Sequence, residues 1–400
     1  MTVAADLAAL WGIGRDRVRG GWSRHVFTRE DAELRAWFVD RATGLGLDVT
    51  TDRNGNSWAW WGAPGSDAVV CGSHLDSVPG GGQYDGPLGV ASALAAVERL
   101  KARDVRPRRP FAVAVFAEEE GSRFGAACLG SRLLTGAIAP ERALALTDGD
   151  GTTFAEAATG ASVDRRHIGR DQEALARIGL FLELHVEQGR ALVDLDAAVG
   201  VASAIDAHGR WRLRFEGQAN HAGTTRMADR HDPMVAAARF VLAAQEIARK
   251  RHGVRATVGR IEPVPGGTNV VASSATAWLD VRAGEDRETR TAVDEILRRA
   301  SECAAAEGCA VATTEESWSS RVAFDPLLAK QFSHALGDAP LLPTGAGHDA
   351  GVLAAAGVPT AMLFVRNPTG VSHSPDEHAE DADCERGVDA LVTCLTEALS

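Results

Sequence analysis

Histidines and carboxylates stand at or just beyond the ends of several apolar, strand-like runs of this sequence. His74, Glu120 and His185 occupy three such places, and Asp85 lies in a glycine-rich turn between the first two. Ligands of open α/β sheets gather beyond the carboxyl ends of the strands. A pair of divalent metal ions needs imidazole and carboxylate ligands, one bridging carboxylate, and an open position for water. The spacing therefore favours a two-metal site in which Asp85 is the bridge.

Neighbouring residues suit supporting roles in such a site. Glu119 is left free to act as a general base beside the ligand Glu120. Asp76, two residues after His74, is placed to orient that imidazole. His373 lies in a polar loop after the last apolar run and is the candidate for a fifth ligand. Taken singly, a lone histidine or a run of glutamates is more often structural or solvated, and only the combination favours a metal site.

Other chemistries lack their required residues. The glycines at 80–82 are not followed by Gly-Lys-Ser/Thr, and Asp85 would repel a phosphate. The sequence also holds no Gly-x-Ser-x-Gly elbow for a serine nucleophile. Its six cysteines form no close pair, which predicts free thiols in a reducing cytoplasm and a metal held by histidines and carboxylates.

Composition indicates an ordinary globular protein. The 400 residues are 45% hydrophobic and 24% charged, and the net charge of -12 argues against nucleic acid as a partner. The one dense basic stretch, residues 101–109, is expected to be a solvated helix end. Residues 1–6 lack the pattern of a signal peptide, and no apolar stretch is long enough to span a membrane, so no membrane partner is expected.

The first half of the chain alternates strand-like and helix-like segments. Apolar runs at 68–71, 111–116 and 180–184 read as buried strands, and a stretch with helical spacing lies between the first two. Thr28 can cap an earlier helix. Alternation of this kind predicts an α/β domain with a mainly parallel sheet.

A different pattern begins near Trp211, where apolar and charged residues alternate. The expected elements are a strand at 211–215, a helix at 233–251, strands at 256–261 and 275–282, a helix at 287–306 and a strand at 309–313. This β-α-β-β-α-β order is the ferredoxin-like arrangement. A strand at 359–365 and a helix from Cys384 then resume the first domain. We therefore expect residues 207–316 to be inserted into a domain formed by 1–206 and 317–400.

The motifs together resemble a known family. They are Gly72–Ser77, Asp85–Gly86, Ala117–Phe124, Glu183–Gly189, Asn220–Thr225, Gly345–Asp349 and Ser372–Pro375. The sequence resembles the hydantoinase/carbamoylase amidases, which include allantoate amidohydrolase, N-carbamoyl-L-amino-acid hydrolase and β-ureidopropionase. These belong to the larger group of di-zinc aminopeptidases and aminoacylases, so the resemblance implies a di-zinc aminopeptidase-like catalytic domain.

The resemblance also implies a division of labour among the site residues. The first metal would be held by His74, Asp85 and His185, and the second by Asp85, Glu120 and His373. Glu119 would be the base, and each subunit would bind two divalent ions, which the sequence leaves open among Zn, Mn and Co.

The inserted domain would act as a lid and as the surface of a homodimer. His221 would reach the active site of the neighbouring subunit and steady the oxyanion. Substrate contacts are implied for Gln188, Asn269, Arg282, Gly347 and His348. Arginine suits a carboxylate because its planar fork offers two hydrogen bonds.

Two positions depart from the family pattern. His208, Gly209 and Arg210 precede Trp211 where allantoate enzymes typically carry Gln-Arg-Arg, so the first arginine, which helps to bind substrate, is missing. Arg226 stands where the family usually has proline. We expect cleavage of a ureido or N-carbamoyl C–N bond in a small carboxylate, with release of ammonia and carbon dioxide. Allantoate, an N-carbamoyl-L-amino acid, ureidoglycolate and an N-formyl amino acid all remain candidate substrates. The rival functions are an aminoacylase, deformylase or dipeptidase on the same scaffold, and a metal-free binding protein.

Overall fold

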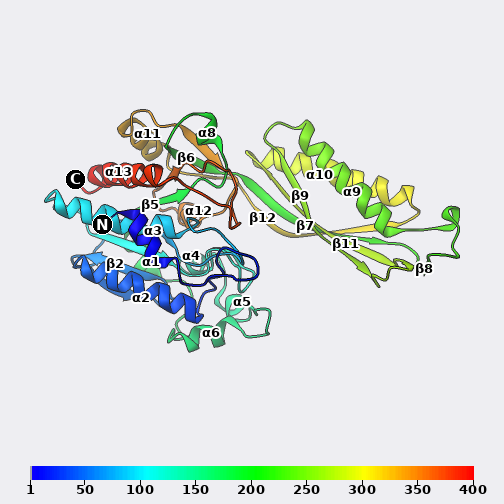
Figure 1. Cartoon of the computed structure of the whole chain (residues 1–400), viewed down its shortest axis with the longest axis horizontal. Coiled ribbons are helices and arrows are strands. Elements are labelled where there is room, and N and C mark those ends of the chain that lie inside the picture. Colours follow the sequence, from blue (N-terminus) through cyan, green and yellow to red (C-terminus); the bar gives the residue numbers. More distant parts are fainter. Residues whose placement is uncertain (1) are drawn as a thin grey trace. The chain divides into compact units, whose positions relative to one another are not determined.

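In the computed structural model, which describes residues 2–400, the predicted apolar runs form the centre of a nine-stranded sheet. Its strands are β1 (Asp48–Thr51), β2 (Ser57–Trp61), β3 (Ala68–His74), β4 (Phe111–Phe116), β5 (Ile178–Val186), β6 (Val199–Ile205), β13 (Val322–Ala323), β14 (Leu341–Thr344) and β15 (Thr360–Val365). Their order is β1-β2-β4-β3-β5-β15-β6-β13, and β14 pairs with β6 (Figure 1).

The centre of this sheet is parallel, as the sequence predicts. β3 pairs in parallel with β4 and β5, and β15 pairs in parallel with β5. β2 and β6 join antiparallel on either side. Every residue of β3, β4 and β15 is buried, because parallel strands of this kind are covered on both faces. The α/β class is therefore confirmed, and the antiparallel outer strands are additions to the prediction.

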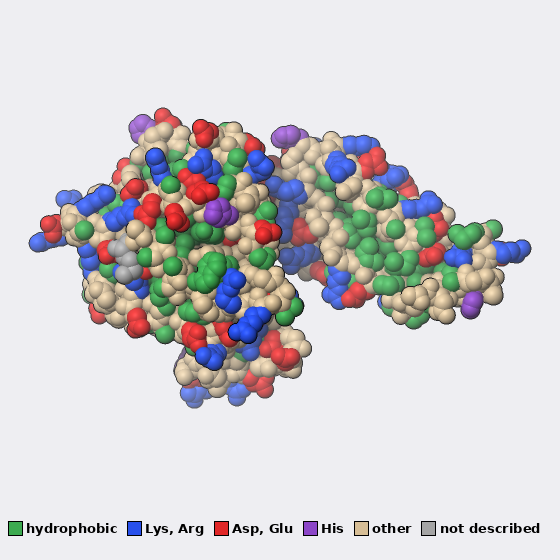
Figure 2. All heavy atoms as spheres, viewed as in Figure 1, with side chains coloured by type: hydrophobic (Ala, Val, Ile, Leu, Met, Phe, Trp, Pro, Cys, Tyr) green, Lys and Arg blue, Asp and Glu red, His purple; other side chains and the backbone are tan. Residues whose placement is uncertain are grey.

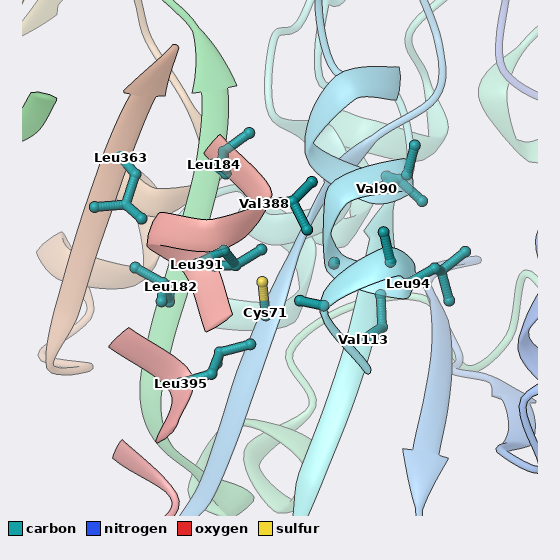
Figure 3. Close-up of a cluster of buried hydrophobic side chains, with 14 of the residues drawn as sticks. Cys71, Val90, Leu94, Val113, Leu182, Leu184, Leu363, Val388, Leu391 and Leu395 are labelled. Carbon is teal, nitrogen blue, oxygen red and sulfur yellow. The ribbon is translucent and has the colours of Figure 1, made fainter. Parts of the chain in front are cut away.

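Helices cover the two faces of the sheet. They are α1 (Val3–Leu10), α2 (Arg29–Gly44), α3 (Pro87–Ala102), α4 (Leu129–Thr135), α5 (Pro140–Leu144), α6 (Phe154–Gly160), α7 (Gln172–Arg177), α8 (Ala191–Asp194), α11 (Pro326–Ala335), α12 (Asp349–Ala355) and α13 (Asp381–Ala398). Thr28 caps α2 as predicted, because its hydroxyl accepts the Asp31 N–H. Figure 3 shows Val388 and Leu391 of α13 beside Cys71 of β3 in the main core, to which Val90 and Leu94 of α3 also belong.

The basic stretch 101–109 differs from its prediction. α3 ends at Ala102, so most of the stretch lies in the loop after the helix. Lys101 packs over the Trp61 ring at 4.8 Å, and Arg109 pairs with Asp67 at 2.8 Å. These contacts hold both ends of the stretch against the protein. The alkyl part of a lysine or arginine side chain can cover apolar surface while its charged group remains in contact with solvent. Among the described residues, no helix is long and apolar enough to cross a membrane.

A second sheet contains four antiparallel strands. The elements of this part are β7 (Ala207–Glu216), β8 (Asn220–His221), η1 (Met227–Asp229), α9 (Pro233–Lys250), β9 (Arg255–Val264), β10 (Val270–Val271), β11 (Ser274–Ala283), α10 (Asp286–Ala306) and β12 (Ala310–Ser319). The strand order is β12-β7-β11-β9, and β8 pairs separately with β10. Along β7, Trp211, Leu213 and Phe215 face a core that α9 and α10 complete, while the residues between them are exposed.

The contacts divide the chain into two compact units. The first unit contains Met1–Ala204 and Ala323–Ser400, and the second contains Ile205–Val322. The sequence prediction placed the insertion at residues 207–316. The start differs by only two residues, because β7 begins at Ala207 as the predicted insertion does. The end lies later than predicted, because β12 runs on to Ser319. All six cysteines are free thiols.

Candidate metal centre

His74, Asp85 and His185 converge in the first unit, and each reaches the site from a different segment. His74 ends β3, His185 lies in β5, and Asp85 lies in the turn before α3. The Nε2 atoms of His74 and His185 lie 3.5 and 3.2 Å from Asp85 Oδ1. All three side chains are buried, and their ligand atoms lie close enough together to hold one ion.

Asp85 also belongs to a second group of ligand atoms, with Glu120 and His373. His373 Nε2 lies 3.4 Å from Asp85 Oδ2 and 3.4 Å from Glu120 Oε2. One oxygen of Asp85 therefore faces the first group and the other faces the second. This is the arrangement that a bridging carboxylate requires.

Three buried atoms at this centre have no hydrogen-bond partner among the described residues. They are His74 Nε2, His185 Nε2 and Glu120 Oε1. The Nδ1 atoms of His74 and His185 donate to the carbonyls of Asp76 and Val186 at 3.0 and 2.9 Å. When the rings are neutral, each Nε2 therefore directs a lone pair toward Asp85, and when they are protonated, each Nε2–H points at the same carboxylate. Buried acceptors without donors favour a cation between them, so the residues fit divalent metal ions.

The charges of these groups are strongly coupled. Burial raises the pKa of Asp85, but hydrogen bonds from His185, His373 and His74 outweigh it and hold that pKa well below its usual range. The hydrogen bond to Asp85 raises the pKa of His373 to about 9. Burial and the nearby Asp85 raise the pKa of Glu120 well above its usual range. Such shifts are typical of functional sites.

Glu119 lies beside the first group without belonging to either. Its Oε2 is 3.7 Å from His74 Nε2, and its Oε1 accepts the Cys128 thiol at 3.4 Å. Burial raises the pKa of Glu119 well above its usual range. The side chain is therefore placed to hold a proton close to both metal positions.

Asp76 contacts His74 differently from the expectation. Its main-chain carbonyl accepts from the imidazole at 3.0 Å, whereas its carboxylate lies 3.7 Å from Nδ1. The carboxylate instead accepts the N–H groups of Glu119 and Glu120 at 3.2 and 3.1 Å. Asp76 therefore fixes the path of the main chain through Glu119 and Glu120.

Gln188, Gly347 and His348 also lie in the first unit. The Gln188 amide donates to Asp85 Oδ2 at 2.8 Å and lies 3.3 Å from His373 Nε2. His348 is buried with its ring centroid 4.6 Å from that of His185, and neither of its ring nitrogens has a partner. Gly347 precedes it in the loop before α12. Gln188 and His348 are thus brought to the metal centre.

His221, Asn269 and Arg282 lie in the second unit. His221 pairs with Val270 across β8 and β10, and the Asn269 carbonyl accepts the Ala222 N–H at 3.0 Å. The His221 Nδ1 accepts the Gly223 N–H at 3.1 Å, so a neutral ring carries its proton on Nε2. His221 and Asn269 therefore lie in one two-stranded ribbon.

Arg282 lies on β11, opposite His208 of β7. It donates to both oxygens of Asp280, from Nε at 2.8 Å and from Nη2 at 3.0 Å. The His208 Nδ1–H donates to the Asp206 carbonyl at 3.0 Å. Arg226, the second departure from the family pattern, pairs with Asp229 at 2.7 Å and is otherwise exposed.

Several buried polar residues of the centre escaped sequence reasoning. Glu183 accepts the Ser73 hydroxyl and the Ala350 N–H, and Asp349 accepts the Ser131 hydroxyl. Glu118 is buried and accepts two main-chain N–H groups, so the triple glutamate is not a solvated helix face. The one sequence feature that could have indicated these residues is that each is a carboxylate within two positions of an expected site residue.

Comparison with known proteins places the chain in a family. Residues 70–397 match peptidase family M20/M25/M40. An N-carbamoyl-L-amino acid amidohydrolase of Geobacillus stearothermophilus is 35% identical, with 93% of this chain and 92% of that protein covered. A ureidoglycolate hydrolase of Arabidopsis thaliana is 31% identical, with 94% of this chain and 82% of that protein covered.

Solved structures agree with this placement. An amidase of the hydantoinase/carbamoylase family from Burkholderia vietnamiensis superposes with a TM-score of 0.87 at 29% identity, covering 99% of this chain and 96% of its own. The crystal structure of AtUAH in complex with glyoxylate gives a TM-score of 0.86 at 29% identity, covering 99% and 96%. The chain therefore belongs to peptidase family M20/M25/M40 and is a hydrolase of its hydantoinase/carbamoylase amidase branch.

Proposed function

We propose that the protein is a two-metal amidohydrolase that cleaves the ureido or N-carbamoyl C–N bond of a small molecule bearing a carboxylate. One observation carries the proposal: the two oxygens of Asp85 face two separate groups of ligand atoms. The names of its relatives, which are N-carbamoyl-L-amino acid amidohydrolases and ureidoglycolate hydrolases, support this choice of bond.

The ligand set divides into two positions that share Asp85. The first position comprises His74, Asp85 and His185, and the second comprises Asp85, Glu120 and His373. When bound, divalent ions such as Zn, Mn or Co polarise a carbonyl and lower the pKa of water. The His and carboxylate donors are compatible with all three metals, so availability is expected to decide which is bound.

Glu119 performs the proton transfers in this proposal. Its raised pKa suits a carboxylate that accepts a proton near neutral pH and returns it. Glu119 takes a proton from the attacking water and gives it to the nitrogen that leaves the carbonyl carbon. The products are an amine and carbamate, and the carbamate decays to ammonia and carbon dioxide.

The second unit supplies further groups in this proposal. It acts as a lid and as the surface of a homodimer, and His221 serves the neighbouring subunit's site. The exposed Nε2–H of His221 suits donation to a developing oxyanion. Figure 2 shows hydrophobic side chains gathered on part of this unit, and Val235 and Leu242 of α9 are 38% and 67% exposed. Exposed apolar surface of this kind supports a protein contact.

Asn269 and Arg282 hold the substrate's carboxylate in the proposal, and Gln188, Gly347 and His348 line the pocket. The pairing of Arg282 with Asp280 fixes the direction of its guanidinium. Gly209, which follows His208 on β7, occupies the place where the first arginine would help to bind allantoate. N-carbamoyl-L-amino acids and ureidoglycolate are therefore placed ahead of allantoate.

A release screen tests the choice of bond. Metal-loaded protein is incubated with N-carbamoyl-L-amino acids, ureidoglycolate and allantoate, and ammonia is measured. In parallel, N-formyl and N-acetyl amino acids and dipeptides are tested for amine release. We expect ammonia from at least one ureido or carbamoyl compound and much slower cleavage of the others. Faster cleavage of acyl, formyl or peptide substrates would establish one of the rival hydrolases instead.

Replacement of the base gives a sharper test. We expect Glu119→Gln to keep the same metal content and lower kcat by about 100-fold to 10,000-fold, the range typical of a lost general base. Elemental analysis and steady-state kinetics measure the two quantities. Glu120→Gln is the contrasting variant, because it removes a proposed ligand and should lower the metal content. A Glu119→Gln enzyme with near wild-type kcat would refute the assignment.

A further inference from the structure

We infer that Glu377 is a positioning residue that latches the loop carrying His373 to the loop carrying Asp85 and so preforms the second metal position. The inference rests on the proposed function, because it concerns the ion held by Asp85, Glu120 and His373. Glu377 lies four residues after His373 and is 5% exposed. Its carboxylate touches both loops, which are far apart in the sequence.

One oxygen of Glu377 holds the main chain of the Asp85 loop. Oε1 accepts the N–H groups of Tyr84 and Asp85, each at 3.0 Å. Two donors converging on one carboxylate oxygen fix the direction of the chain at Asp85. Because Asp85 bridges the two positions, a rotation of its backbone would move both carboxylate oxygens.

The other oxygen of Glu377 reaches the loop that carries the histidine ligand. Oε2 accepts the Ser372 hydroxyl at 3.1 Å, and Ser372 directly precedes His373. The Ser372 Oγ also lies 3.4 Å from Asp85 Oδ2 and accepts the Gln188 amide at 3.2 Å. Glu377, Ser372, Gln188 and Asp85 thus form one hydrogen-bonded chain around the bridging carboxylate.

The glycine-rich turn leaves space for this contact. A Cβ added at Gly82 would lie 2.2 Å from Glu377 Oε1. His373 itself has a φ of +54°, in the left-handed region that non-glycine residues rarely adopt. Such a conformation persists only where its surroundings enforce it. The Glu377 contacts supply that restraint on one side of His373.

The first metal position is held in another way. His74 and His185 lie in the paired, buried strands β3 and β5, so their positions do not depend on Glu377. Loss of the Glu377 carboxylate should therefore affect the second ion more than the first. This selectivity separates positioning from a general loss of stability.

Titration of metal-stripped protein with Mn²⁺ by calorimetry tests the inference. We expect two binding steps for the wild type, and at least about tenfold weaker binding in one step only for Glu377→Ala, as for other lost outer-sphere partners. Glu377→Gln keeps one acceptor oxygen for the Tyr84 and Asp85 N–H groups, and its NH2 group can donate to the Ser372 hydroxyl, so binding should stay within about threefold of the wild type. Asp376→Ala is the matched control, because that neighbouring carboxylate is exposed, and it should bind like the wild type.

Gly82→Ala approaches the same contact from the opposite side, should Glu377→Ala fail to fold. It should weaken the same binding step, because the added methyl displaces the carboxylate. Two unchanged steps in both Glu377→Ala and Gly82→Ala would overturn the inference, as would Glu377→Gln binding as weakly as Glu377→Ala. A wild-type protein that binds fewer than two ions and cleaves no ureido compound would instead refute the proposed function.

Discussion

At the scale of single residues, the most informative side chain is Asp85, whose carboxylate is shared by three histidines. Its two oxygens point to opposite groups of ligands. The neighbouring imidazoles hold the Asp85 carboxyl ionised, and Asp85 in turn holds His373 protonated, with a pKa of about 9. Metal binding must therefore displace a proton from His373, because a protonated Nε2 has no lone pair to donate.

This competition predicts a pH dependence. Below a pH of about 9 the His373 ring carries the proton that an ion must displace, so binding at the second position weakens as the pH falls. Release of one proton corresponds to about a tenfold loss of affinity per pH unit. Calorimetry with Mn²⁺ at pH 7 and pH 8, in buffers of different ionisation enthalpy, measures both the affinity and the protons released.

Another histidine provides the control for this experiment. His378 lies in the same segment but is half-exposed, with its ring 3.2 Å from Glu380 and edge-on to Tyr84, and it belongs to neither group of candidate ligands. His378→Ala should therefore keep the full pH dependence. His373→Ala should lose one binding step. An affinity that stays constant between pH 7 and pH 8 would contradict the assignment of His373 as a ligand.

The expected ligands were accessible from the sequence because their chemistry is local. His74 and His185 stand at the ends of apolar runs that predict strands, and Asp85 lies in the glycine-rich turn after the first run. The structure brings all three together. The Asp76 carboxylate accepts the main-chain N–H groups of Glu119 and Glu120, and these contacts could not be predicted because the direction of an N–H group depends on the path of a loop. Glu183 and Glu377 were missed for the same reason.

At the scale of elements, the site depends on the passage from β3 through the glycine-rich turn into α3. Gly86 directly precedes the helix with a φ of +84°, and a Cβ there would lie 2.4 Å from Cε1 of His74. The buried His74 ring has no room to retreat. The helix therefore begins with glycine because the ligand occupies the space that a side chain would take.

Replacement of this glycine should disturb fold and site together. We expect Gly86→Ala to lower the free energy of unfolding by roughly 1–3 kcal/mol, the cost of an enforced left-handed conformation. Binding at the first metal position should weaken as well, because the imidazole must move. Urea denaturation and Mn²⁺ titration measure the two effects.

Gly44 offers a matched comparison at the end of α2. A Cβ added there has no atom within 4 Å. Gly44→Ala should therefore raise stability by up to about 1 kcal/mol, because alanine favours the helix, and should leave metal binding unchanged. A Gly86→Ala protein that matched Gly44→Ala in both measurements would show that the turn tolerates a side chain.

The sequence predicted the central elements better than the outer ones. The runs at Phe111–Phe116 and Thr360–Val365 are continuous and apolar, and they are strands over nearly the expected bounds. β2 escaped prediction because Ser57–Trp61 is dominated by tryptophans and shows no clear alternation. β6 escaped because its small residues carry little strand signal, although they are mostly buried beside β15.

At the scale of the whole molecule, the two units have separate cores. The main core of the first unit and the core of the second have no residue in common. The chain leaves the first unit after β6 and returns at β13, which is its neighbour in the sheet. The Phe324 N–H donates to the Ser203 carbonyl at 3.2 Å, so the exit and the return are adjacent. A short connection could therefore replace the second unit.

Deletion of residues 205–322, with a linker of about four glycine and serine residues, should leave the metal centre intact. All five proposed ligands belong to the first unit, as does Glu377. We expect cooperative unfolding and two Mn²⁺ binding steps like those of the full chain. Because the proposed function assigns His221 and Arg282 to the second unit, kcat/KM should fall by at least about 100-fold.

Light scattering on the same pair of proteins separates the roles of the second unit. The full chain should be a dimer and the deletion variant a monomer, since the proposed contact surface, with Val235 and Leu242, is removed. A deletion variant that keeps turnover would refute the substrate and oxyanion roles of the second unit. A deletion variant that binds fewer metal ions would show that the metal centre needs the second unit. Retained metals with lost turnover would place the ligands in one unit and the selection of the substrate in the other.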